Sequence, residues 1–273
     1  MTKRCTELAL THSYVRTWVD DGSLPADPFG ADLEAWRSAL EGHCTEQAPG
    51  ERAGEDAADG LFHAQPYLWL RTTGYRLKSW EEELARLSAA AVRPGSVGIV
   101  HCLWKAGLVR SQPDWRRALV RWLTAWNAAD HVSDHDAYRV THAAFYITDL
   151  GNQDAPVEAA DRDRLVDIAR NLLGSSAVRG RWDLVGELLV ALTCLGSDDA
   201  YQQDATRAFR TERALSAPAA AQPTASAGDE TPKQRDEAFR RGYHTTMVDV
   251  LRCAVSTHRA AGRAFPREGE GTP

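Results

Sequence analysis

The feature that most constrains this chain is a recurring alternation between helices with one apolar face and helices that are apolar on nearly every side. The one-faced segments are predicted at 79–92, 113–127 and 161–173. The more apolar segments are predicted at 96–108, 136–151, 180–196 and, last in the series, 242–255. Because large apolar residues recur at helical spacing and no segment alternates at period two for long, the sequence predicts an all-α fold.

Two layers of helices satisfy this alternation. A helix that is apolar on all sides must be enclosed, whereas a one-faced neighbour can lie outside it and meet water. Repeated helix pairs of this kind form either a closed α/α toroid or a curved α-solenoid. With so few pairs a closed ring buries more of the inner layer, so we favour the toroid. We expect a single helical-repeat domain over residues 1–265, with further helices at 4–19 and 31–41.

Three segments lack the large apolar side chains that would offset the entropy lost on ordering. The acidic, Gly-rich stretch 46–60 is predicted to be a mobile loop, and the Pro/Ala/Ser-rich stretch 214–232 a flexible linker. Residues 266–273 are predicted to be a disordered tail. The string HVSDHD at 131–136 resembles a metal cluster, but Ser133 or Asp134 is better placed to cap the helix that follows.

Composition excludes several classes of function. A net charge of −6 without a basic stripe argues against a nucleic-acid partner, and no apolar run is long enough to cross a bilayer. The N-terminus lacks a secretory pattern, which predicts a cytoplasmic protein. Five scattered cysteines predict free, mostly buried thiols. No Gly-rich phosphate loop, GxSxG elbow or DDxxD run occurs.

Four ionisable residues on the apolar helices are candidates for one site. Superposing Leu150-Gly151 on Leu195-Gly196, the ends of two such helices, carries His142 onto Glu187. His101 and His244 lie about one repeat away on either side. Because equivalent positions on the inner helices of a ring point toward one cavity, we expect these four side chains to converge. The sequence thereby predicts a shared polar site.

Three interpretations of that site stay open. Three imidazoles and one carboxylate could ligate zinc, although no compact ligand motif supports a metal and we predict no cofactor. The same groups could act as general acids and bases, since histidine titrates near neutrality and burial tunes a glutamate. They could also be structural groups that only satisfy hydrogen bonds on buried helices.

Neighbouring side chains extend the candidate site. Asp149 and Asp183 add a second polar group to the helices of His142 and Glu187. Each also has a structural interpretation: Asp149 could end its helix, and Asp183 could pair with Arg181 at the surface. Aromatic residues that could line a substrate pocket are Trp104, Tyr138, Tyr146, Trp182 and Tyr243. With His101 they form the predicted substrate-binding set, although aromatics at helical spacing are also ordinary core residues.

Three strings carry a resemblance to known proteins. YRVTHAAFYITDLG, RWDLVGELLVAL and YHTTMVDVL resemble an uncharacterised family of actinobacterial all-helical proteins, over about 95–255, and the resemblance implies no activity. The paired-helix pattern is also similar to that of the α/α-toroid enzymes, which include terpene cyclases, protein prenyltransferases and lanthionine cyclases. The Cys-Cys-His zinc set of the lanthionine cyclases is missing.

Two functions follow as expectations. The first is an enzyme of bacterial specialised metabolism with a central aromatic-lined pocket, which performs cyclisation, isomerisation or elimination on an apolar small molecule or peptide. His142, Glu187 and His244 would carry the chemistry, with Asp149 and Asp183 in support. The alternative is a non-catalytic helical-repeat protein that binds a peptide or protein partner on its concave surface. The sequence does not indicate an oligomeric state.

Overall fold

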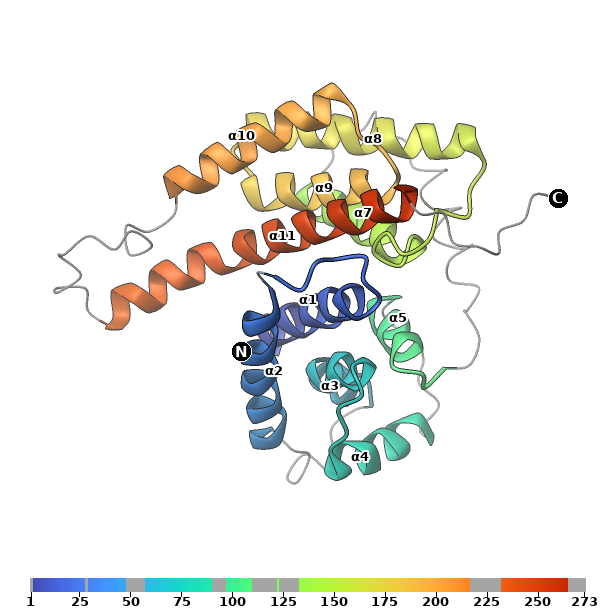
Figure 1. Cartoon of the computed structure of the whole chain (residues 1–273), viewed down its shortest axis with the longest axis vertical. Coiled ribbons are helices and arrows are strands. Elements are labelled where there is room, and N and C mark those ends of the chain that lie inside the picture. Colours follow the sequence, from blue (N-terminus) through green and yellow to red (C-terminus); the bar gives the residue numbers. More distant parts are fainter. Residues whose placement is uncertain are drawn as a thin grey trace. The chain divides into compact units, whose positions relative to one another are not determined.

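A computed structural model of the protein describes residues 2–27, 29–47, 57–89, 97–109, 122, 133–216 and 232–264. Within these ranges it contains ten helices and no strand, so the all-α class is confirmed for the described residues (Figure 1). The chain divides into two compact units: unit 1 is Met1–Arg117 with Ala260–Pro273, and unit 2 is Ala118–Arg259. A single domain over 1–265 and its arrangement as a toroid or solenoid stay predictions.

Unit 1 is built around one enclosed helix, α3. Its helices are α1 (Thr2–Asp20), α2 (Phe29–Glu46), α3 (Ala57–Thr72), α4 (Lys78–Ala89) and α5 (Val97–Lys105). α3 contacts each of the other four. Residues 67–70 of α3, which read Tyr-Leu-Trp-Leu, are at most 2% exposed. Four consecutive buried side chains point in all directions around a helix, so α3 needs neighbours on every side.

Polar contacts of α3 and α4 complete unit 1. Arg71 of α3 forms an ion pair with Glu81 of α4 at 2.9 Å and donates to the carbonyl of Ala106, just after α5. The Trp80 indole N–H donates to the carbonyl of Cys44 in α2 at 2.9 Å, and its ring stacks on that of Tyr67. The ends of α2, α3, α4 and α5 are therefore fixed to one another by side chains as well as by apolar packing.

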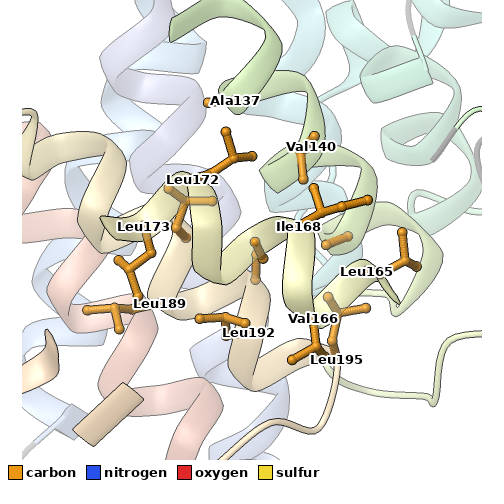
Figure 2. Close-up of a cluster of buried hydrophobic side chains, with 14 of the residues drawn as sticks. Ala137, Val140, Leu165, Val166, Ile168, Leu172, Leu173, Leu189, Leu192 and Leu195 are labelled. Atoms are coloured by element: carbon orange, nitrogen blue, oxygen red, sulfur yellow. The ribbon is translucent and has the colours of Figure 1, made fainter. Parts of the chain in front are cut away.

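Unit 2 has the same plan around α9. Its helices are α7 (Asp134–Ile147), α8 (Ala159–Val178), α9 (Trp182–Cys194), α10 (Ala200–Ser216) and most of α11 (Pro232–Ala264). α9 contacts α7, α8 and α10, and every residue from Leu184 to Cys194 is buried. α8 is buried along one face, whose side chains mesh with those of α9 in the core (Figure 2). The expected succession of a one-faced helix and an enclosed helix is thus present in α8 and α9.

A glycine sets how closely α9 approaches α10 and α11. A Cβ atom at Gly186 would lie 2.7 Å from Cγ1 of Val248 in α11 and 2.9 Å from Cζ of Phe209 in α10. Both neighbours are buried and have little room to move. Glycine is unfavourable in the middle of a helix, so its presence here is explained by this close packing.

The ends of α7 follow local capping rules. The Ser133 hydroxyl accepts a hydrogen bond from the Asp136 N–H at 3.2 Å, which confirms that the HVSDHD segment caps a helix. His131 of that segment lies outside the described residues. At the other end α7 gives way to a turn in which Asp149, Leu150 and Gly151 have left-handed φ angles of 47°, 54° and 87°.

The predicted loop 46–60 and the predicted linker 214–232 are shorter in the structure, because the neighbouring helices continue into them. α2 continues to Glu46 and α3 begins at Ala57, so only 48–56 of the predicted loop remain, outside the described residues. α10 likewise continues to Ser216, and α11 begins at Pro232. The predicted helix 113–127, apart from Trp122, and the tail 266–273 also lie outside.

Two helices were absent from the sequence-based prediction. α3 contains Pro66, and a proline inside an apolar pattern normally indicates that a helix ends. α10 carries mostly polar residues, so it has few large apolar side chains from which a helix could be predicted. In both cases contacts with neighbouring helices, which are not visible in the local sequence, stabilise the helix.

Two simple expectations are met. All five cysteines are free, and Cys44, Cys102 and Cys194 are buried. Within the described residues, no helix combines the length and the apolar character that crossing a bilayer requires.

The packing at Gly186 predicts that Gly186→Ala lowers the free energy of unfolding by about 1–3 kcal/mol, because the added methyl group overlaps Val248 and Phe209. Gly42→Ala in α2 is the matched control, since a Cβ there would meet nothing within 4 Å. We expect the control to raise stability by about 0.5–1 kcal/mol through helix propensity. Urea unfolding followed by circular dichroism measures both; a Gly186→Ala protein as stable as the wild type would contradict the packing argument.

Candidate functional site

Three helices of unit 2 bring His142, Glu187 and His244 together. His244 Nε2 of α11 lies 3.2 Å from Glu187 Oε1, and His142 Nε2 of α7 lies 3.6 Å from Glu187 Oε2. Thr141 of α7 donates its hydroxyl hydrogen to Oε2 at 2.8 Å. Both carboxylate oxygens of Glu187 therefore have polar neighbours. We call Glu187, Thr141, His142 and His244 the Glu187 cluster.

The environment of Glu187 explains why it needs these neighbours. It is 6% exposed and is the one ionisable side chain, cysteine aside, in the apolar run from Leu184 to Cys194. An ionised carboxylate without partners in such a place loses several kcal/mol of hydration free energy. A hydroxyl donor and two imidazoles offset that loss, so the cluster makes the buried charge tolerable.

A second carboxylate lies one helical turn before Glu187. Asp183 accepts a hydrogen bond from the Tyr138 hydroxyl of α7. Tyr138 and Thr141 are three residues apart on α7, and Asp183 and Glu187 are four apart on α9, so each pair shares a helix face. α7 and α9 are thus joined at successive turns by two hydroxyl-to-carboxylate hydrogen bonds.

Burial and hydrogen bonding act in opposite directions on Asp183. Burial by itself would raise the pKa of this carboxyl group. The hydrogen bonds from Tyr138 and from the Leu184 N–H, together with the nearby Arg181 and His244, outweigh burial and hold the pKa below its ordinary value. For Tyr138, burial and the bond to Asp183 both raise the pKa of the phenol. At neutral pH the pair is therefore a carboxylate and a neutral phenol.

The two imidazoles connect the buried carboxylate to the surface. The His142 side chain is 50% exposed and that of His244 is 23% exposed, against 8% for Glu187. The His142 ring has aromatic neighbours in Tyr138, Phe145 and Tyr146, with ring centroids 5.9–6.4 Å away. Imidazoles next to a carboxylate are groups that general acid/base chemistry uses.

The fourth predicted member, His101, lies in unit 1. It is 1% exposed on α5, and its ring lies between those of Trp69 and Trp104, with centroids 5.9 and 5.8 Å away. Trp104, predicted to line the pocket, is therefore a neighbour of His101 within unit 1. The repeat spacing treats α5 as equivalent to α7, whereas α5 packs against α3 of its own unit.

Other predicted residues lie at the edges of the site. α7 ends at Ile147, so Asp149 is not on the helical face of His142; it lies in the following turn and accepts a hydrogen bond from Asn152 at 3.0 Å. Trp182 is the first residue of α9 and packs against the core of unit 2. Tyr243 precedes His244, with ring centroids 6.1 Å apart.

Thr141 was not among the predicted residues. A signal for the α7–α9 contacts was present, because the alignment that carries His142 onto Glu187 also carries Tyr138 onto Asp183. It did not reveal that α7 and α9 contact each other directly, nor that a hydroxyl next to His142 would reach Glu187.

Metal binding gains no support from the arrangement. Within the part of the chain that the structure describes, no three His, Cys, Asp or Glu side chains are placed to hold a metal ion together. The zinc alternative stays a prediction.

Fold and site together define a helical protein with a buried carboxylate–imidazole cluster. The chain belongs to the family described as "Domain of unknown function (DUF6895)", whose model matches residues 1–254. The match includes the whole Glu187 cluster and confirms the predicted membership of an uncharacterised all-helical family. No curated protein and no solved structure matches the chain.

The lowered pKa of Asp183 gives a pH-dependent prediction. A carboxyl group with a depressed pKa stabilises the fold above its unfolded pKa, about 4, and loses that contribution as the pH falls through its folded value. Tyr138→Phe removes one cause of the depression, so at neutral pH we expect it to lower the unfolding free energy by about 1–2 kcal/mol. This deficit should shrink below about pH 4 as Asp183 is protonated.

Tyr201→Phe is the matched control. Its hydroxyl donates to the carbonyl of Arg170, which does not titrate, so the effect of this substitution should not change with pH in this range. Denaturant unfolding at a series of pH values measures both variants. A Tyr138→Phe deficit as constant as that of Tyr201→Phe would show that Asp183 does not depend on the phenol.

Proposed function

We propose that unit 2 carries an enzyme site for acid/base chemistry, centred on Glu187. The observation that carries the proposal is the contact of a 6% exposed carboxylate with two imidazoles that reach the surface. In this proposal His142 is the general base and acid, because it is the most exposed member of the cluster and lies beyond hydrogen-bond distance of Glu187. His244 and Thr141 hold the carboxylate in place.

The chemistry follows from the proton balance. Neutral His142 accepts a proton from a C–H or O–H bond of the substrate, and Glu187 stabilises the resulting imidazolium. The imidazolium then returns that proton to another atom of the substrate, which completes an isomerisation or cyclisation, or to a leaving group, which completes an elimination. No redox step and no covalent intermediate is needed.

Several finer points belong to the same proposal. The substrate would be an apolar small molecule or peptide that contacts the rings around His142, and the setting would be specialised metabolism in the cytoplasm. Repeated helix pairs, arranged as an α/α toroid or a curved α-solenoid, would form the surrounding frame. The one-faced α8 beside the enclosed α9 supports that arrangement.

The competing function is a non-catalytic interaction protein. The observation in its favour is that Asp183 and Glu187 both accept hydrogen bonds from hydroxyls of α7, as purely structural carboxylates would. On this view the cluster only joins helices, and its substitution would change stability without changing any metabolite.

The proposal predicts that His142→Ala and Glu187→Gln abolish the activity of the protein in its own organism. We expect strains carrying either variant at the native locus to show the same metabolite profile as a deletion strain. Glu82→Gln, an exposed glutamate of unit 1 that pairs with Lys78, is the control and should give the wild-type profile. Mass spectrometry compares the profiles, and immunoblots show that each variant is present at wild-type level.

His142 separates the two functions, because its half-exposed ring lies 3.6 Å from Glu187, farther than Thr141 and His244, so we expect its removal to lower stability less than removal of either of those two. A folded, normally abundant His142→Ala protein with a wild-type profile would overturn the enzyme proposal and favour the interaction protein.

A further inference from the structure

Three consecutive polar residues of α1 in unit 1, Thr11, His12 and Ser13, are at most 3% exposed. Thr11 donates its hydroxyl hydrogen to the carbonyl of Glu7. The Ser13 hydroxyl pairs with that of Thr72 in α3. In contrast, the buried Nδ1 atom of His12 has no hydrogen-bond partner among the described residues. Because an imidazolium carries N–H groups on both nitrogens, protonation of His12 would bury an N–H donor without an acceptor.

The surroundings of His12 also disfavour a positive charge on its ring. Burial is the largest cause that lowers the pKa of His12, and the charges of Arg16 in α1 and Arg37 in α2 lower it further. Glu34 of α2 and a hydrogen bond with the Leu33 backbone act in the opposite direction without reversing the shift. Glu34 is itself bound to Arg16 at 2.7 Å, so its charge is already partly compensated.

Other charged groups of this helix pair do not supply a free anion. Asp20 is bound to Arg16 at 3.0 Å, and Glu41 to Arg37 at 2.7 Å. His43 of α2 is a second imidazole in the pair, and burial lowers its pKa as well. Acid therefore adds positive charge to an α1–α2 interface that already holds two guanidinium groups.

α1 has further contacts with α3 and α5, which hold it in place independently of α2. The Tyr14 ring lies 5.7 Å from that of Trp69 in α3, and the Lys105 ammonium, just at the end of α5, lies 5.1 Å from the Tyr14 centroid. Arg71 of α3 is paired with Glu81 of α4. The charges that α3 and α5 bring to this part of unit 1 are thus positive, and α2 is the more weakly held partner of α1.

We infer that the first half of α2, residues 29–37, is a proton-released segment: it packs on α1 while His12 is neutral and separates from α1 when His12 is protonated. The far end of α2 stays in place, because the Trp80 indole donates to the carbonyl of Cys44 at 2.9 Å. Release uncovers Leu33, which is 2% exposed in the packed state. The device lies in unit 1 and does not depend on the proposed function of the Glu187 cluster.

The direction of the pKa shift sets the pH window. A histidine whose pKa is lower in the fold than in the unfolded chain, where it is about 6.5, stabilises its interface fully above that value. The stabilisation is lost as the pH falls below about 6.5 toward the folded pKa. The lowered pKa of His43 acts with the same sign, so the packing of 29–37 on α1 weakens with acid.

Hydrogen exchange of the full-length protein, followed by mass spectrometry at about pH 7.5 and about pH 5.5, tests the inference. Exchange rates are corrected for the intrinsic effect of pH, and α8 of unit 2 is the internal reference. We expect peptides from 29–37 to lose about tenfold or more of their protection at the lower pH, relative to α8.

Two histidine variants locate the effect. His12→Gln is neutral at every pH, so most of the loss of protection at 29–37 should disappear in this variant. His63→Gln removes a partly exposed histidine of α3 and is the matched control, which should behave as the wild type does. His12→Leu takes the place of His12→Gln if that variant does not fold.

Protection of 29–37 that does not change with pH, or that falls equally in the His12 variant, overturns the inference. An equal loss across α1, α2 and α3 also overturns it, since unit 1 would then unfold as a whole. An NMR titration of the wild-type imidazoles needs no variant: His12 should titrate with a midpoint below about 6.5, and a midpoint at or above that value contradicts the device.

Discussion

The fold of unit 2 depends on how α9 accommodates a buried carboxyl group inside an apolar helix. The residues around Glu187 on α9 have buried side chains that are mostly apolar or small. The carboxyl group of Glu187 therefore needs hydrogen-bond partners from neighbouring helices. Thr141 and His142 of α7 and His244 of α11 are the polar side chains next to it. The close fit at Gly186 limits how α11 can move along α9, and the polar contacts of Glu187 add a second constraint on the register of α7 and α11, because a buried carboxyl group without a partner is destabilising.

Unit 1 contains a carboxylate whose charged partner cannot titrate, although this carboxylate is only partly buried. Glu81 accepts a hydrogen bond from Tyr67 and pairs with Arg71, whose guanidinium stays charged at any physiological pH. That arrangement joins helices and holds no group that titrates near neutral pH, because the pKa of Tyr67 is raised to about 12 and that of Glu81 is lowered. The Glu187 cluster also uses hydroxyl donors, but imidazoles stand in the place of the guanidinium. The proposed proton chemistry of unit 2 rests on this difference in partner: His142 and His244 lie beside Glu187, whereas Arg71 lies beside Glu81.

The sequence predicted the helical class and part of the site, for identifiable physical reasons. The α8–α9 pair was visible because apolar periodicity is a local property, and His142, Glu187 and His244 were visible because ionisable residues are rare on apolar helices. Periodicity could not distinguish equivalent helices in one unit from similar helices in two, so His101 of unit 1 was grouped with three residues of unit 2. It also could not show Thr141, whose role depends on the side of α7 that faces α9. Pro66 hid α3 for a comparable reason, since the contacts that stabilise this helix come from four others.

The glycine at 186 has a consequence for the site as well as for the core. It is adjacent to Glu187 on α9, and Val248, which it contacts, lies one turn after His244 on α11. The separation of α9 and α11 therefore determines both the steric fit at 186 and the reach of the His244 imidazole toward the carboxylate. A larger residue at 186 would lengthen the 3.2 Å contact before it unfolded the chain. In a set of natural relatives, the residue at position 186 would then vary together with the residue at position 248. A change at one position alone would alter the contact between His244 and Glu187 in a protein that is still folded.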